Sequence, residues 1–128
     1  MSPMPTRVVE TRARSNRSFR THPAVAWRHY LVAIGNRDVE AVLEAMTVEY
    51  SRQLRTLRPT REFGPLFELW CASQPRAVQL VTCVIQGDAA TLEGRDGEDL
   101  CRIHLRHVDG VWRIGAEEFI HGEQRRSR

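Results

Sequence analysis

The chain of 128 residues is long enough for one domain with a hydrophobic core and too short for two domains of ordinary size. Its hydrophobic fraction of 41% is that of a globular protein, and no apolar run approaches the ~20 residues that a membrane-spanning helix needs. This composition excludes a disordered polyelectrolyte and predicts no contact with a membrane.

The net charge of +3 is concentrated at the two ends of the chain. Residues 23–120 carry eleven arginines against fourteen acidic residues, so the body of the domain is mildly acidic. Residues 1–22 carry five arginines and one glutamate, without the apolar run of a secretory signal. We predict disordered basic tails at 1–22 and 121–128, with a transit peptide or a misassigned start as alternatives for the first. All nineteen basic residues are arginine, which points to a bacterium with a GC-rich genome.

The first part of the domain has the residue spacing of helices. Thr21 and His22 precede Pro23, a common helix start because proline lacks only an N–H that would have no partner there. Apolar residues then recur at three- and four-residue intervals, which predicts an amphipathic helix. This stripe consists of Trp27, Tyr30, Leu31 and Ile34.

Further helices are predicted before the strands begin. The segment 35–38 interrupts the first helix, and Asp38 caps a second helical segment whose pattern continues until Pro59. Thr60 opens a short third helix that closes at residues 73–75. The apolar residues of these segments are Val39, Val42, Leu43, Met46, Val48, Leu54, Leu57, Phe63, Leu66, Phe67 and Trp70.

From residue 76 the apolar period changes to two, which is typical of strands. Asp109-Gly110 between two such runs predicts a hairpin, because a type I′ turn needs a positive φ at both central residues. Helices followed by an antiparallel meander indicate an α+β fold, with a curved four-stranded sheet around the helices. The predicted strands are 77–85, 89–94, 100–108 and 111–120.

The two-residue turn sets the predicted register of the last two strands, with Val108 opposite Val111 and pairing continued outward. Glu118 then lies on the apolar face, where a carboxylate is costly unless it is paired or hydrated. The predicted core face carries Leu105–Ile114, Ile103–Ala116, His107–Trp112 and Cys101–Glu118. The predicted outer face carries the like-charge pair Arg106–Arg113, and also His104–Gly115, Arg102–Glu117 and Leu100–Phe119.

Three segments resemble the nuclear transport factor 2-like superfamily: "HYLVAIGNRD" (29–38), "VIQGDAATLEG" (84–94) and "RIHLRHVDGVWRI" (102–114). The resemblance covers about residues 23–120 and implies a cone-shaped α+β roll. The superfamily includes ketosteroid isomerases, polyketide cyclases, limonene-epoxide hydrolases and many non-catalytic domains, so the fold alone does not choose a function.

Comparison with the isomerases implies a place for one functional residue. Tyr30 matches the isomerase tyrosine that donates a hydrogen bond to the developing oxyanion. The isomerase general base corresponds to the neighbourhood of Leu54, and the second acid to Ile103 and His104, where this chain has no carboxylate. The Asp-Arg-Asp set of the epoxide hydrolases has no inward-facing counterpart either. The resemblance therefore implies a pocket rather than one of these reactions.

We predict a pocket between the helices and the sheet. Tyr30 and Glu118 are its candidate catalytic residues, as hydrogen-bond donor and general base, although a core aromatic and a solvated strand end also explain them. The predicted lining is Trp27, Tyr30, Ile34, Phe67, Trp70, Ile103, Trp112 and Glu118. A basic ridge suited to anions, or a solvated helix face, consists of Arg52, Arg55, Arg58 and Arg61.

Metal and cofactor motifs are missing from the sequence. The histidines have no companions at metal-ligand spacing, and the sequence shows no phosphate-binding loop, so we predict neither a metal nor a cofactor. Cys71, Cys83 and Cys101 lie in apolar patterns, which predicts small buried residues in a reducing cytoplasm.

We predict a non-catalytic domain that binds a small apolar ligand or a protein partner. The alternative is a cofactor-independent enzyme of the isomerase, cyclase or dehydratase type that uses Tyr30 and Glu118. A third hypothesis is an immunity or secretion-accessory protein. No nucleic-acid-binding motif is present. The predicted interface of a homodimer, on the outer sheet face, consists of Arg102, Arg106, Arg113 and Glu117.

Overall fold

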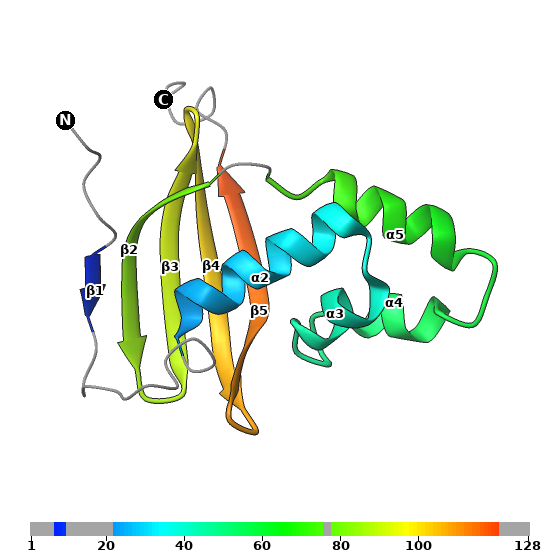
Figure 1. The fold of residues 1–128 in the computed structure, drawn as a ribbon, viewed down its shortest axis with the longest axis horizontal. Helices are drawn as coiled ribbons and strands as arrows, with labels where there is room; N and C mark the ends of the chain where they lie inside the picture. The colour runs from blue at the N-terminus through cyan, green and yellow to red at the C-terminus, as the bar shows by residue number, and fades with distance from the viewer. Residues whose placement is uncertain (1–6, 10–21, 76–77, 121–128) are drawn as a thin grey trace.

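The structure is a computed structural model that describes residues 7–9, 22–75 and 78–120. It is an α+β fold with helices and four antiparallel strands in one sheet, which confirms the predicted class (Figure 1). The elements in chain order are β1 (Arg7–Val9), α2 (Pro23–Asn36), α3 (Val39–Glu44), α4 (Arg52–Leu57), α5 (Phe63–Ala72), β2 (Gln79–Gln86), β3 (Ala89–Asp96), β4 (Asp99–Val108) and β5 (Val111–Ile120).

A fifth strand lies at one edge of the sheet. β1 pairs with β2 in parallel, with Val8 opposite Cys83. The sequence predicts a disordered tail at 1–22, and the structure departs from that prediction at residues 7–9. Parallel neighbours need a long crossover connection, and α2 to α5 lie in the chain between these two strands. The remainder of the predicted tails, at 1–6, 10–21 and 121–128, lies outside the described residues.

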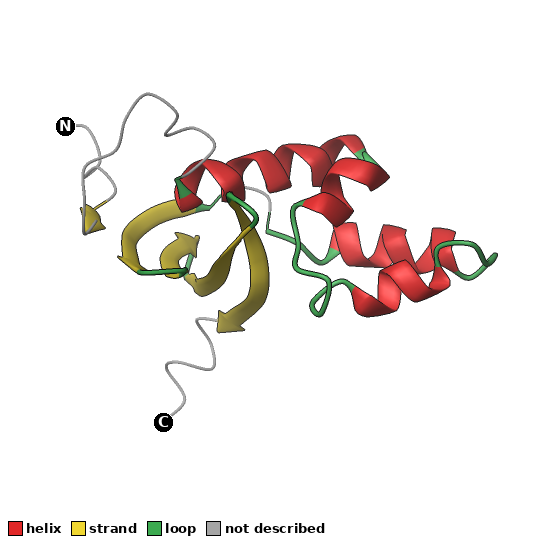
Figure 2. Cartoon of the chain, turned by 90° about the horizontal axis from the view of Figure 1, so that it is seen from below, coloured by secondary structure: helices red, strands yellow, loops and turns green. Residues whose placement is uncertain are grey.

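Helix α2 crosses one face of the sheet, whereas α3, α4 and α5 lie beyond the β5 edge (Figures 1 and 2). The side chain of His22 caps α2 by accepting a hydrogen bond from the backbone N–H of Ala24 at 3.1 Å. The helix ends where Arg37 adopts the left-handed conformation, with φ 54°. Its sheet-facing residues Trp27 and Tyr30 are fully buried.

The helical pattern predicted from Val39 to Pro59 is interrupted in the structure. The backbone leaves α3 after Glu44 and pairs with β5, where the N–H of Thr47 donates to the carbonyl of Ile114 at 2.9 Å. The N–H of Ile114 in turn donates to the carbonyl of Ala45 at 2.8 Å. These hydrogen bonds satisfy backbone groups at the edge of β5. The free energy gained from them outweighs the local preference for a continuous helix.

All three antiparallel hairpins of the sheet close with two-residue turns. Asp109 and Gly110 have φ of 53° and 79°, as the predicted type I′ turn requires. The polar segment 95–99 is predicted as a loop, but β3 extends to Asp96 and β4 begins at Asp99, with Gly97 at φ 69° between them. The strands are therefore longer than the apolar pattern indicates.

Strand β5 contains a β-bulge that the predicted register lacks. From Val108–Val111 to Leu105–Ile114 the pairs follow the prediction. At Gly115 β5 has one extra residue, so the pairs beyond it shift by one position. Because side chains alternate along a strand, every later side chain of β5 lies on the face opposite to the predicted one. The observed later pairs are His104–Ala116, Ile103–Glu117, Arg102–Glu118, Cys101–Phe119 and Leu100–Ile120.

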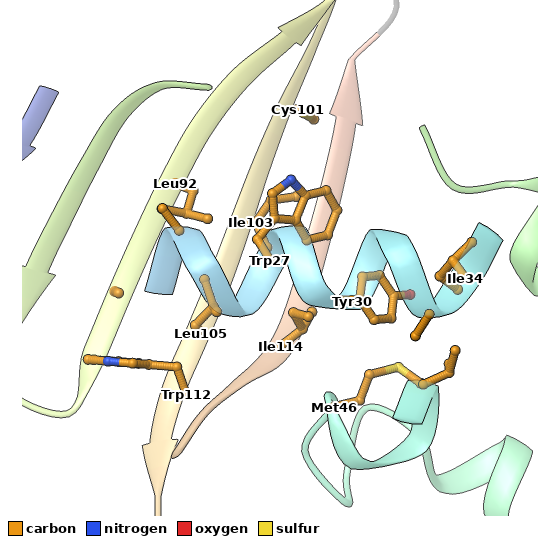
Figure 3. Close-up of a cluster of buried hydrophobic side chains, with 14 of the residues drawn as sticks. Trp27, Tyr30, Ile34, Met46, Leu92, Cys101, Ile103, Leu105, Trp112 and Ile114 are labelled. Carbon is orange, nitrogen blue, oxygen red and sulfur yellow. The ribbon is translucent and has the colours of Figure 1, made fainter. Parts of the chain in front are cut away.

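The hydrophobic core lies between α2 and the sheet (Figure 3). Met46 joins it from the segment after α3, and Trp112 lies at its lower end, where its ring is 4.8 Å from that of His107. The core is closed, because its largest side chains are almost completely buried. They include Trp27, Tyr30, Met46, Leu54, Leu92, Ile103, Leu105 and Ile114.

The close approach of β2 to β3 at Gly94 gives a test of this packing. A Cβ added at Gly94 would lie 2.6 Å from Cγ1 of Val78 and 2.9 Å from the carbonyl oxygen of Gln79. We expect Gly94→Ala to lower the free energy of unfolding by about 1–3 kcal/mol in urea denaturation, because backbone has to move. The control is Gly64→Ala in α5, where an added Cβ meets nothing within 4 Å. Equal stability of the two variants would contradict the observed packing.

Candidate functional site

The bulge at Gly115 decides which of two adjacent glutamates points into the domain. Glu117 is paired with Ile103, which is fully buried, and lies on the inner face of the sheet. Glu118 is paired with Arg102 on the outer face and is exposed. The sequence predicts Glu118 in the pocket and Glu117 at the outer interface, and both predictions are wrong. The error is a shift of one residue, which exchanges the two faces of a strand.

Two residues from outside the sheet hydrogen-bond Glu117. The phenol of Tyr50, in the turn between α3 and α4, donates to Oε1 at 2.6 Å. The side-chain amide nitrogen of Gln74, which follows α5, donates to Oε2 at 2.7 Å and to Oε1 at 3.3 Å. This amide orientation is the one that gives both its oxygen and its nitrogen suitable partners. Glu117 therefore ties β5 to the α3–α4 turn and to the end of α5.

Tyr30 joins the same group of side chains from α2. Its phenol oxygen accepts hydrogen bonds from the indole nitrogen of Trp70 at 2.9 Å and from the amide of Gln74 at 3.2 Å. Its ring stacks on Trp27 with centroids 5.5 Å apart, and the rings of Tyr50 and Trp70 meet edge to face at 5.4 Å. We refer to the following five residues as the Glu117 cluster: Tyr30, Tyr50, Trp70, Gln74 and Glu117.

Burial controls the protonation of the Glu117 cluster. It raises the pKa of Glu117 from the ordinary 4.5 to about 7, and the hydrogen bonds from Tyr50 and Gln74 oppose this shift. Burial and then the charge of Glu117 raise the pKa values of Tyr30 and Tyr50 above their ordinary 10. Near neutral pH the cluster thus has one exchangeable proton, on Glu117, and two phenols that stay protonated and can donate hydrogen bonds.

Two hollows flank the Glu117 cluster, and Gln74 and Pro75 line both of them. The first, the α2–α5 hollow, has a volume of about 330 Å³ and the second, the sheet-end hollow, about 300 Å³. Both volumes are at the lower end of the range for small-molecule sites, so each suits a compact ligand. Other residues of the α2–α5 hollow are Leu31, Ile34, Arg37 and Cys71. Other residues of the sheet-end hollow are Asp96, Asp99, Cys101 and Phe119.

The structure divides the predicted pocket residues between core and site. Tyr30 and Trp70 belong to the Glu117 cluster, and Ile34 lines the α2–α5 hollow. Phe67 stacks on Phe63 with centroids 5.3 Å apart. Core residues with buried side chains are Trp27, Ile34, Phe67, Ile103 and Trp112. The predicted deep pocket between helices and sheet is therefore filled by these side chains.

Sequence reasoning misses Tyr50 and Gln74 and places Glu117 on the wrong face. Tyr50 lies where a continuing helix is predicted, and Gln74 lies in a polar helix end that is usually solvated. Neither position carries a local sign of its partner, which is 67 residues away in the case of Tyr50. One signal was present for Glu117, because an isolated glycine in a strand pattern, here Gly115, often marks a bulge.

The outer face of the sheet carries a network of charged side chains around Arg102. Its guanidinium donates to Glu93 at 2.9 Å and to Glu118 at 3.1 Å. His104 lies 3.7 Å from the same oxygen of Glu118. The predicted pair Arg102–Glu117 is therefore replaced by Arg102–Glu118, as the bulge requires.

The like-charge pair on the outer face is present, and one of its members has another partner. Arg106 lies opposite Arg113 in the β4–β5 ladder, as predicted. The guanidinium of Arg113 donates a hydrogen bond to the backbone carbonyl of Glu44 at the end of α3. This bond directs the Arg113 charge toward a helix C-terminus, where a cation is favoured.

The predicted basic ridge does not act as one group. Arg55 is exposed, but its guanidinium donates to Oγ of Ser51 at 2.6 Å and to the carbonyl of Leu43 at 2.7 Å. Arg58 is paired with Glu40 at 2.7 Å. Arg52 and Arg61 are exposed. The four arginines therefore do not converge on one anion site.

Other expectations concern metals, cysteines and membranes. Within residues 7–9, 22–75 and 78–120, no group of three or more His, Cys, Asp or Glu side chains could hold a metal ion. All three cysteines are buried, which confirms their predicted burial. No helix in the described part of the chain combines the length and apolar character needed to cross a bilayer.

No protein-family model matches the chain, and no curated protein matches it. The geometry of the site therefore carries the functional argument.

Arg55→Ala tests whether Arg55 has a structural role that Arg52 lacks. We expect Arg55→Ala to lower the free energy of unfolding by about 1–2 kcal/mol, because the carbonyl of Leu43 and the hydroxyl of Ser51 lose a charged donor. Arg52→Ala on the same helix is the control and should change stability by less than about 0.5 kcal/mol. Urea denaturation of both variants measures the difference, and equal losses would show that Arg55 has no special structural role.

Glu117→Gln tests the protonation of the cluster. The folded-state pKa of about 7 lies above the ordinary 4.5, so the stabilising contribution of Glu117 is complete below about pH 4.5 and is lost as pH rises through about 7. We expect this loss to approach about 3 kcal/mol between about pH 5 and pH 8 in the wild type, and to be missing in Glu117→Gln. Urea denaturation at both pH values measures it. Glu118→Gln is the control and should keep the wild-type pH dependence.

Proposed function

We propose that this chain is a small-ligand-binding domain of the nuclear transport factor 2-like type, in which a ligand beside Gln74 interacts with Glu117. The observation that carries the proposal is the hydrogen bond between Glu117, a carboxyl with a pKa of about 7, and Gln74, a residue that lines both hollows. A titratable group with a strongly shifted pKa at a cleft is characteristic of functional sites.

The contacts of Gln74 support this location. Its amide bonds Glu117 and Tyr30, while the same residue lines both hollows. A ligand in either hollow thus lies beside a residue that is hydrogen-bonded to the carboxyl. The position of Tyr30 also supports the resemblance, because the tyrosine that matches the isomerase residue lies in the same hydrogen-bonded group as Glu117.

An acid–base enzyme of the isomerase, cyclase or dehydratase type is the second candidate, with Glu117 in the role first given to Glu118. The observation in its favour is the pKa of about 7, since a general base works best when its pKa lies near the working pH. Tyr50 and Tyr30 would supply hydrogen-bond donors. We favour binding because Tyr30 is completely buried, so a substrate atom has no access to its O–H.

A cytoplasmic homodimer through the outer sheet face belongs to the same proposal. With the bulge included, its interface consists of Arg102, Arg106, Arg113 and Glu118 in place of Glu117. The immunity or secretion-accessory hypothesis stays a prediction, and salt-sensitive binding to an acidic protein would support it.

Native mass spectrometry after incubation with a bacterial metabolite extract tests the ligand proposal. We expect the wild type to carry one reproducible added mass, and Glu117→Gln to lose at least about tenfold in its occupancy, because a hydrogen-bonded carboxylate contact is replaced. Glu118→Gln, on the outer face, should keep the added mass. Equal occupancy in the two variants, or no added mass in any of the three proteins, would contradict the proposal.

A further inference from the structure

The sheet-end hollow has two carboxylates in its wall, both from the β3–β4 hairpin. Asp96 and Asp99 lie directly opposite each other in the ladder, on either side of the two-residue turn. Like charges in directly opposed positions of a sheet repel each other. Within the described part of the chain, no arginine or histidine forms an ion pair with Asp96. This wall is therefore suited to a positive charge.

Cys101 marks the inner end of the same hollow. It lies two residues beyond Asp99 on β4 and is buried. Burial, with the charges of Asp96 and Glu117, raises the pKa of its thiol to about 11. The carboxyls of Asp96 and Glu117 therefore both act on the buried Cys101 side chain, and the electrostatic potential there favours cations over anions.

An unpartnered hydrogen-bond donor is aimed at this point. Trp27 is 1% exposed, and its indole nitrogen has no hydrogen-bond partner among the described residues. Figure 3 shows the nitrogen edge of the indole turned toward Cys101. A buried N–H is costly to leave without an acceptor, so an oxygen atom placed here would be favoured.

We propose that the sheet-end hollow binds a small organic cation that also carries a hydroxyl or carbonyl oxygen. The ammonium group lies against Asp96, with the charge of Glu117 adding to the attraction. The oxygen accepts a hydrogen bond from Trp27, and the ring of Phe119 provides an apolar wall. The inference rests on the proposed function, since it names the class of ligand that reaches the Glu117 cluster.

Three compounds that share one carbon frame and differ in charge test the ligand class. They are 2-amino-1-phenylethanol, the neutral 1-phenyl-1,2-ethanediol and the anion mandelate. Binding to the full chain is followed by the indole ¹H–¹⁵N signal of Trp27 in NMR titrations. We expect the amine to bind at least about tenfold more tightly than the diol, and mandelate to bind more weakly than the diol. Equal affinities, or a preference for mandelate, would overturn the proposal.

Two variants assign this preference to the hollow. Asp96→Asn should reduce the advantage of the amine over the diol to less than about threefold, whereas Asp109→Asn, in the distant β4–β5 turn, should leave it unchanged. An advantage that survives Asp96→Asn overturns the proposal. In Trp27→Phe, which lacks the indole, binding is followed by the backbone ¹H–¹⁵N signal of Cys101. This variant should lose the preference for 2-amino-1-phenylethanol over 2-phenylethylamine, which lacks the oxygen. If Trp27→Phe does not fold, the comparison of these two amines in the wild type decides, and equal affinities count against the oxygen contact.

The outcome also separates this inference from the proposed function. If the extract ligand depends on Glu117 but the amine is not preferred, the proposal of a cationic ligand is wrong and the proposal of a ligand-binding domain stands. Loss of both results removes both proposals.

Discussion

A carboxylate on the inner face of a sheet has to be hydrogen-bonded or neutralised, and the bulge at Gly115 places Glu117 in that position. Neighbouring side chains meet this requirement by hydrogen bonding to Glu117, without a cation. Tyr50 and Gln74 donate to its two oxygens, and burial leaves its proton exchangeable near neutral pH. Burial raises the pKa of this carboxyl, and the proposed ligand contact rests on that shift.

The Glu117 cluster is also the place where the two parts of the domain meet. Helices α3, α4 and α5 lie beyond the β5 edge and do not cover the sheet as α2 does (Figures 1 and 2). Their buried apolar residues, among them Val42 and Leu54, belong to the same hydrophobic cluster as α2 and the sheet. Polar contacts add to this packing, through Glu117, through the backbone bonds of Thr47 with Ile114, and through the ion pair of Arg37 with Glu68 at 2.6 Å. Polar contacts of this kind are geometrically specific, so they set the position of α5 relative to the sheet.

The location of the hollows follows from how completely the core is filled. Trp27 and Met46 occupy the space between α2 and the sheet, so there is no room for a ligand in the middle of the domain (Figure 3). Space remains where the elements end, beside Gln74 and Pro75. A ligand bound in one of these hollows would contact strand ends and turn residues. In the sheet-end hollow, the strand ends supply the acids Asp96 and Asp99.

The sequence by itself determined that helices precede the four antiparallel strands, and it determined the start of α2 at Pro23, the cap at Asp38 and the turn at Asp109-Gly110. These features depend on neighbours within a few residues, and the apolar period reports them directly. Only the tertiary structure decided which face Glu117 occupies and which residues surround it. Beyond Ile114 the residues Gly-Ala-Glu-Glu have no apolar alternation, so nothing local opposes a shift by one position. The partners of Glu117 come from turns and a helix end far away in the chain, and packing alone brings them together.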